Sequence, residues 1–195
     1  MGHIYCLMGK SACGKDTIFS MLIDDKELNL SRIVPYTTRP IRSEETDGDQ
    51  YHFTDEDGLA DYRSQGKVIE ERCYHTIHGD WFYFTVDDGL VKEDADYLVI
   101  GTIEVFTKLS EYYGKERVIP LYIEIDDGER LERALKRERS QDNPKYAELC
   151  RRFLADASDF SEENIKSAGI DDRFRFDNNE LDKCVLSLKN TIINN

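Results

Sequence analysis

The sequence predicts an α/β fold: a three-layer α/β/α core with a mostly parallel central sheet, a phosphate-binding loop, a small inserted lobe and a helical lid. Two observations predict the core. Short apolar segments alternate with helix-like segments, which is typical of right-handed βαβ units, and a glycine-rich loop follows the first apolar segment. A third observation predicts the lobe, because residues 37–86 break this alternation. The 195 residues suffice for one compact domain with small attachments.

The core elements follow from residue periodicity and composition. Apolar, β-branched segments predict strands at 3–8, 97–102 and 118–125, and helical spacing predicts helices at 14–25, 103–114, 126–140 and from about Asn179 onward. Gly114 is expected to end the second of these helices. In the charged helix, Leu131 and Leu135 are expected on the inner face. The last helix places four apolar residues along one stripe: Leu181, Val185, Leu188 and Ile192.

Two segments are expected to be attachments to this core. The first contains "QYHF", "KVIEER" and "WFYFTV", which predict a mostly β lobe, and the second contains "SQDNPKY", which interrupts two charged helices and predicts a mobile lid. The resulting division is core 1–36, lobe 37–86, core 87–136, lid 137–152 and core 153–195.

Composition restricts the class of function. A net charge of −14 argues against a nucleic-acid surface, and no apolar segment approaches the roughly 20 residues that span a bilayer. The five cysteines form no CxxC pair and are read as reduced thiols of a cytoplasmic protein, a monomer or homodimer. His75 and His78 have no further metal ligands close in sequence, so they are read as surface residues rather than a zinc site.

The loop "MGKSACGKDT" has the spacing of a phosphate-binding loop, with Gly9, Gly14 and Lys15 at the required positions. Main-chain N–H groups and the start of a helix would face the phosphates there. The residues expected to hold ATP are Gly9, Lys10, Ser11, Ala12, Cys13, Gly14, Lys15, Asp16 and Thr17. The alternative is a glycine-rich turn with no ligand.

Asp16 stands where this motif normally supplies a hydroxyl group to Mg²⁺. Its carboxylate suits Mg²⁺, which prefers oxygen ligands, and Thr17 offers a hydroxyl one residue later. Asp16 and Thr17 are therefore the candidate metal ligands. Cys13 is either a thiol made acidic by the helix start or a buried, inert one.

A second candidate anion site lies in "TTRPIR". Pro40 stiffens this segment, so Arg39 and Arg42 can direct two guanidinium groups at one anion, with the Tyr51 hydroxyl as a third donor. The alternative is a basic turn on the surface.

The order of these motifs resembles the guanylate kinase family. "TTRPIR", "GDQYHF" and "VIEER" follow the loop in the family's order, "LKRE" and "CRRF" resemble its arginine-bearing lid, and "FDNNELDKCV" resembles its C-terminal segment. The chain departs from the family at Pro35 and Tyr36, at Thr102–Glu104, and in "CYHTIHGDW", which is about four residues longer.

The resemblance implies roles for individual residues. The acceptor's phosphate would be held by Arg39, Arg42, Tyr51 and Tyr83, its base by Glu70 and Thr85, with Glu104 as the remaining acid nearby; Lys15, Arg133, Arg137 and Arg152 would be catalytic. A carboxylate at Glu70 suits guanine, which presents two adjacent donors, whereas adenine presents an acceptor that would repel it. The alternative for Glu70 is a strand residue that faces solvent. The alternative for Arg133, Arg137 and Arg152 is a solvated, charged helix face.

The implied activity is transfer of a phosphoryl group from ATP, with Mg²⁺, to a nucleoside monophosphate, most of all GMP or dGMP. Small-molecule nucleotides are the expected partners. Two other functions stay open: a kinase of the same fold acting on another phosphorylated acceptor, such as ribose 1,5-bisphosphate, and a non-catalytic binding module.

Overall fold

The computed structural model describes residues 1–42, 45–76 and 79–195. Its centre is a five-stranded sheet with the order β2-β7-β1-β8-β9, in which all neighbouring strands run parallel. The strands are β1 (Ile4–Met8), β2 (Ser31–Arg32), β7 (Tyr97–Ile100), β8 (Val118–Glu124) and β9 (Arg175–Asp177). The predicted parallel sheet is confirmed, with β2 and β9 added at its edges.

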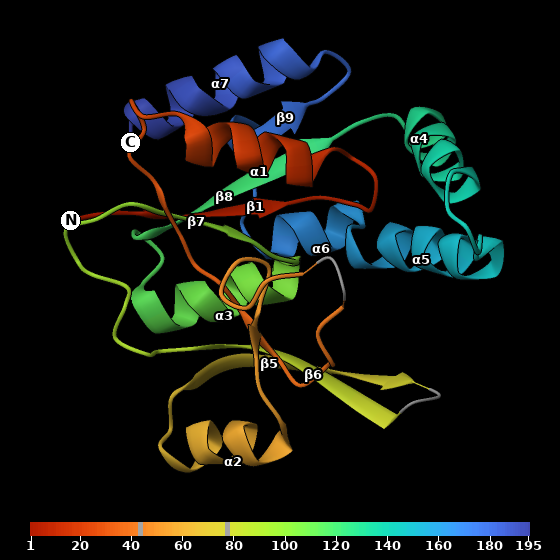
Figure 1. The fold of residues 1–195 in the computed structure, drawn as a ribbon. Helices are drawn as coiled ribbons and strands as arrows, with labels where there is room; N and C mark the ends of the chain where they lie inside the picture. The colour runs from red at the N-terminus through yellow and green to blue at the C-terminus, as the bar shows by residue number, and fades with distance from the viewer. Residues whose placement is uncertain (43–44, 77–78) are drawn as a thin grey trace.

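Helices cover both faces of this sheet (Figure 1). One face carries α1 (Lys15–Asp24) and α7 (Leu181–Ile193), and the other carries α3 (Ile103–Tyr113) and α6 (Glu162–Ser167). Strand β1 shows the reason, because all of its side chains are buried and successive ones enter opposite cores. Tyr5 and Leu7 pack with α1 and α7, whereas Ile4, Cys6 and Met8 pack with α3 and α6. The predicted three layers are confirmed.

A second sheet lies below α3 in Figure 1. Its order is β4-β3-β6-β5, from β3 (Tyr36–Thr37), β4 (His52–Phe53), β5 (Val68–Thr76) and β6 (Gly79–Val86). The helix α2 (Glu56–Ser64) packs on this sheet through Leu59, which contacts Phe84 and Val86. Sequence analysis missed α2, because its one fully buried side chain lies within the polar stretch "EDGLADYRS".

Two charged helices, α4 (Asp127–Arg139) and α5 (Tyr146–Asp159), pack against each other at one end of the central sheet. The prediction that Leu131 and Leu135 form the inner face of α4 is wrong. Leu131 is 40% exposed and Leu135 half-buried, while Arg130 and Ala134 are buried. Arg130 forms an ion pair with Asp156 of α5, and Asp127 forms one with Lys10 of the loop after β1.

The other helix predictions hold with small shifts. Helix α3 ends before Gly114, which has a positive φ of 99°. The buried stripe of α7 is Cys184, Leu188 and Ile192, with Val185 half-buried and Leu181 exposed at its first turn. A short 3₁₀ helix, Asp172–Phe174, precedes β9. Among the described residues, no helix is long and apolar enough to span a membrane.

Candidate functional site

The loop between β1 and α1 needs glycine at both of its predicted positions. Gly9 and Gly14 have φ angles of 151° and 95°, which L side chains rarely adopt. A Cβ atom on Gly9 would lie 2.5 Å from the carbonyl oxygen of Ile123, and one on Gly14 would lie 2.5 Å from Nδ2 of Asn178. The two glycines therefore let the loop pack closely against β8 and the segment after β9.

Lys15 curls back over the loop that precedes it. Its Nζ donates to the carbonyl oxygens of Gly9 (2.6 Å) and Lys10 (3.0 Å). The ammonium group is thus held beside the loop's main chain at the start of α1, where the helix contributes partial positive charge. An anion at this position would meet both charges.

A hollow of about 180 Å³ opens beside this loop. Its lining combines the loop with α4: Ala12, Gly14, Lys15, Asp16, Thr17, Arg133 and Arg137. Arg152 of α5 also reaches the loop, since its Nη2 donates to Oγ of Ser11 at 3.1 Å. The structure therefore brings all three predicted lid arginines to the loop.

A buried charge cluster that sequence analysis missed fixes α4 and α5 against the loop. Arg130 is 1% exposed, and its guanidinium donates to Asp127 (3.0 Å) and Asp156 (3.1 Å) while lying 3.8 Å from the centre of the Phe153 ring. Asp156 also accepts from the main-chain N–H of Ser11 at 2.8 Å. In the sequence, Arg130 looks like any other arginine of this charged helix, so no local signal singles it out.

A buried hydrogen bond between Asn178 and Cys13 anchors the loop. Asn178 Nδ2 donates to the carbonyl oxygen of Cys13 at 2.8 Å. Cys13 is 1% exposed, and burial raises the pKa of its thiol despite the neighbouring Lys15. Of the two readings of Cys13, the structure supports the buried thiol that stays protonated.

In the lobe, two residues after β3, Arg39 is buried rather than free on the surface, with 3% exposure. Its Nη1 and Nη2 donate to the two carboxylate oxygens of Glu45 at 2.9 and 2.7 Å, and its Nε donates to the Tyr83 hydroxyl at 3.1 Å. Hydrogen bonds to Glu45 raise the pKa of Arg39, and Arg39 in turn lowers the pKa of Glu45. The guanidinium group is therefore already holding one carboxylate.

Tyr51 completes this group, because the Arg39 Cζ atom lies 5.6 Å from the centre of the Tyr51 ring and the Tyr51 and Tyr83 rings are 5.4 Å apart. Burial raises the pKa of Tyr51. Arg42 differs: it is exposed, and its main-chain N–H donates to Glu45 at 2.9 Å.

Glu70 lies inside the lobe, 4% exposed, so the solvent-facing alternative is wrong. Its two carboxylate oxygens accept from Oγ1 of Thr85 (2.7 Å) and Nε of Arg72 (3.1 Å). Thr85 is opposite Glu70 in the antiparallel pairing of β5 with β6. Burial opposes the charge of Arg72, but Glu70 outweighs it and the pKa of Arg72 is raised.

Arg72 was missed by sequence analysis, although its position two residues after Glu70 places both on one face of β5. Glu104 is exposed in the first turn of α3, not in the buried Glu70–Thr85 pair. His78 lies outside the described residues.

Comparisons with known proteins agree with this geometry. The family model described as guanylate kinase matches residues 1–195. A guanylate kinase from Paraburkholderia xenovorans is 29% identical over 82% of this chain and 68% of its own length, and one from Porphyromonas gingivalis is 25% identical over 98% and 97%. The crystal structure of guanylate kinase from Anaplasma phagocytophilum superposes with a TM-score of 0.65, covering 98% of this chain and 84% of the other at 20% identity. That likeness concerns the fold.

Proposed function

This chain belongs to the guanylate kinase family and is a phosphotransferase that acts on nucleoside monophosphates; from that premise, we propose that it transfers the γ-phosphoryl group of ATP to GMP or dGMP. The proposal depends on the presence of two cationic sites of different kinds in one chain. One is the loop with Lys15 and the lid arginines, and the other is the buried Arg39 with its tyrosines.

The loop is the proposed site for ATP. Residues 9–17 would surround the β- and γ-phosphates with main-chain N–H groups, and Lys15 would supply a point charge. Arg133, Arg137 and Arg152, which already lie around the loop, would neutralise the charge on the transferring group. Phosphoryl transfer requires little covalent chemistry from a protein, so positioning and charge neutralisation would carry the reaction.

The lobe is the proposed site for the acceptor. Arg39, Arg42, Tyr51 and Tyr83 would hold its phosphate, with Glu45 exchanged for that phosphate on Arg39. Glu70 supports guanine as the base, because its carboxylate is ionically paired with Arg72 and oriented by the Thr85 hydroxyl. Such a carboxylate accepts from the N1–H and N2 amine of guanine, whereas adenine offers an acceptor at N1. Glu104 stays a prediction as the further acid near the base.

The residues beside the loop fit Mg²⁺. Asp16 and Thr17 line the same hollow as Lys15 and offer a carboxylate and a hydroxyl, the oxygen ligands that Mg²⁺ prefers. When bound, the ion would neutralise charge on the ATP phosphates. We propose that lobe residues 37–86 and lid residues 137–152 close over both substrates and exclude water, which limits hydrolysis of ATP.

The test is a coupled assay of ADP release with one enzyme preparation and six acceptors: GMP, dGMP, AMP, CMP, UMP and ribose 1,5-bisphosphate. We expect GMP and dGMP to have the highest kcat/KM, and AMP to be lower by about 10⁴-fold, as for other sites that hydrogen-bond the distinguishing group. Preference for the sugar would refute the base-recognition role of Glu70 while leaving the loop chemistry intact. ADP release that no acceptor stimulates would refute the proposal altogether.

A further inference from the structure

The hairpin of β5 and β6 includes Cys73, His75 and Asp80, all from the segment "CYHTIHGDW". Cys73 and His75 are two residues apart on β5, so their side chains leave the same face. The strand pairing sets His75 directly opposite Asp80 of β6. Three side chains of different chemistry therefore share one face of this hairpin.

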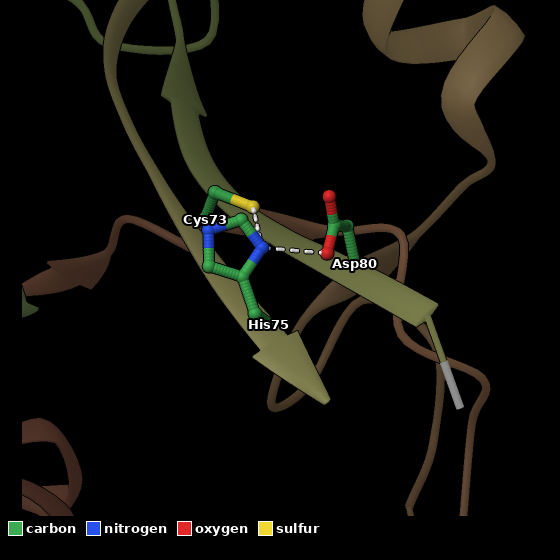
Figure 2. A group of neighbouring side chains, drawn as sticks. All are labelled: Cys73, His75 and Asp80. Atoms are coloured by element: carbon green, nitrogen blue, oxygen red, sulfur yellow. Dashed lines mark hydrogen bonds and ion pairs between the residues drawn. The ribbon is translucent and has the colours of Figure 1, made fainter. Parts of the chain in front are cut away.

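These three side chains point toward one another (Figure 2). Nδ1 of His75 lies 2.7 Å from a carboxylate oxygen of Asp80 and 4.0 Å from Sγ of Cys73. One ligand atom from each residue lies within 4.8 Å of the others, and among residues 1–42, 45–76 and 79–195 no other group of three histidine, cysteine or acidic side chains does so. Three converging atoms at these spacings can reach one ion after small side-chain rotations.

We propose that Cys73, His75 and Asp80 bind one zinc ion, which links the two strands of this hairpin. A thiolate, an imidazole and a carboxylate together form a donor set that suits Zn²⁺, whereas Mg²⁺ and Ca²⁺ select oxygen ligands. This site is therefore chemically distinct from the oxygen ligands near the ATP loop. Three protein ligands leave the fourth tetrahedral position for water.

The ordinary alternative is a surface ion pair between His75 and Asp80. Such a pair explains the 2.7 Å contact between His75 and Asp80, but it does not explain why the Cys73 side chain lies beside them. All three residues are exposed, so a hydrated ion can reach them without opening the fold. On binding, the Cys73 thiol loses its proton to solvent as the metal–sulfur bond forms, and affinity should therefore rise with pH.

The position of this site predicts a mechanical effect. The same two strands carry Glu70, Tyr83 and Thr85, and their pairing shifts register between Val68 and Glu70. A metal link at Cys73 and Asp80 would oppose sliding of the strands, because one residue of slippage would separate the ligands. Zinc should therefore slow hydrogen exchange in β5 and β6. Zinc binding at this hairpin does not depend on the acceptor's identity.

The test is titration of the full chain with ZnCl₂, followed calorimetrically, and with CoCl₂, followed by the thiolate-to-cobalt absorption band. We expect one equivalent of Zn²⁺ per chain and a cobalt band that requires Cys73. Cys73→Ser, His75→Asn and Asp80→Asn should each weaken Zn²⁺ binding by more than about 100-fold, because even residues that only orient metal ligands contribute 10- to 100-fold.

The matched control is Cys150→Ser, which removes another exposed cysteine, on α5. It should leave zinc affinity and the cobalt band unchanged. Thermal unfolding without metal should be the same in all four variants, and added Zn²⁺ should raise the Tm of the wild type and Cys150→Ser alone. Zinc binding that survives Cys73→Ser and His75→Asn, a cobalt band lost in Cys150→Ser, or no binding at all would overturn the proposal.

Discussion

The two cationic sites of this protein are built in opposite ways. The proposed ATP loop is nine consecutive residues, 9–17, and a Cβ atom on Gly9 or Gly14 would lie 2.5 Å from a main-chain or side-chain atom of a neighbouring segment. The lobe site is made of side chains from β5, β6 and the segment between β3 and β4. Each site holds a carboxylate of the protein itself: Asp156 on the Ser11 N–H and Glu45 on Arg39.

This difference predicts different sensitivities. A site formed by the main chain should tolerate most side-chain changes, except at the glycines and the lysine. A site formed by buried side chains should respond to conservative changes as well, because the geometry of each donor matters. The following predictions test this contrast, from the largest expected effect to the smallest.

Lys15→Ala should lower kcat/KM by about 10²- to 10³-fold, the usual effect of losing one donor to a transition state's charge. The loss should fall on kcat and on the KM for ATP, with the KM for GMP little changed. Steady-state kinetics with each substrate varied in turn would measure it.

Lys115→Ala is the control for removing a positive charge, because Lys115 is exposed in the turn after α3. It should behave as the wild type. Near-normal turnover in Lys15→Ala, with an unchanged Tm, would contradict the assignment of the loop to ATP.

Arg39→Lys should raise the KM for the acceptor about 100-fold and leave the KM for ATP unchanged. Lysine keeps the charge but loses the forked geometry that contacts Glu45 and Tyr83 in the free protein and would contact phosphate in the complex. The measurement is the acceptor KM at saturating ATP.

Arg63→Lys is the matched control in the same lobe. Arg63 also forms a forked pair, with Glu71, but at an exposed position on α2. Its acceptor KM should stay within about twofold of the wild type, as is usual for exposed ion pairs. Equal effects of Arg39→Lys and Arg63→Lys would remove Arg39 from the acceptor site.

Glu45→Gln should lower the free energy of unfolding by about 2 kcal/mol, because it leaves the buried Arg39 charge without its partner. For a chain of this size, that corresponds to a Tm about 4 to 8 °C lower at pH 7. Calorimetric unfolding would measure it.

The loss of stability caused by Glu45→Gln should also depend on pH. Arg39 lowers the pKa of Glu45, so the pair's stabilisation is complete above the unfolded value of about 4.3 and disappears as pH falls through the lower, folded value. The Tm difference between variant and wild type should therefore shrink below about pH 4. Glu71→Gln, which breaks the exposed pair with Arg63, should cost about 0.5 kcal/mol or less. A larger loss there than at Glu45 would reverse the contrast between buried and exposed pairs.

The contrast between the two sites also explains what could be predicted from the sequence. The three inner strands of the central sheet, the helices α1, α3 and α7, and the glycine loop were predicted because their signals are local: apolar runs, helical spacing and a glycine pattern. The short edge strands β2 and β9 and the short helix α6 were not predicted. The lobe's strands were also predicted from local signals. Helix α2 was missed because its burial depends on Leu59 alone.

Partners that lie far apart in sequence could not be predicted. Asp156 meets Ser11 across 145 residues, and Arg130 is buried although the spacing of leucines predicted that α4 would pack through Leu131. Cys73 and Asp80 are close to His75 in sequence, but they were not read with it as one group, because only the pairing of β5 with β6 sets Asp80 opposite His75. These contacts result from the topology of the fold, which local residue patterns do not reveal.

Thr85→Val tests the smallest element of the lobe site. Valine matches threonine in shape, so the packing of β6 should survive, but Glu70 loses the 2.7 Å hydrogen bond that orients its carboxylate. A hydrogen bond of this kind contributes about 1 kcal/mol, so the KM for GMP should rise about fivefold with kcat unchanged. Arg72 still pairs with Glu70, which limits the effect. Because Thr107→Val removes a hydroxyl that donates to the Ile103 carbonyl oxygen within α3, it should leave the KM for GMP unchanged. If Thr85→Val instead lowered kcat and spared the KM, the hydroxyl would serve the transferring phosphoryl group rather than the base, and the division of the two sites would have to be redrawn.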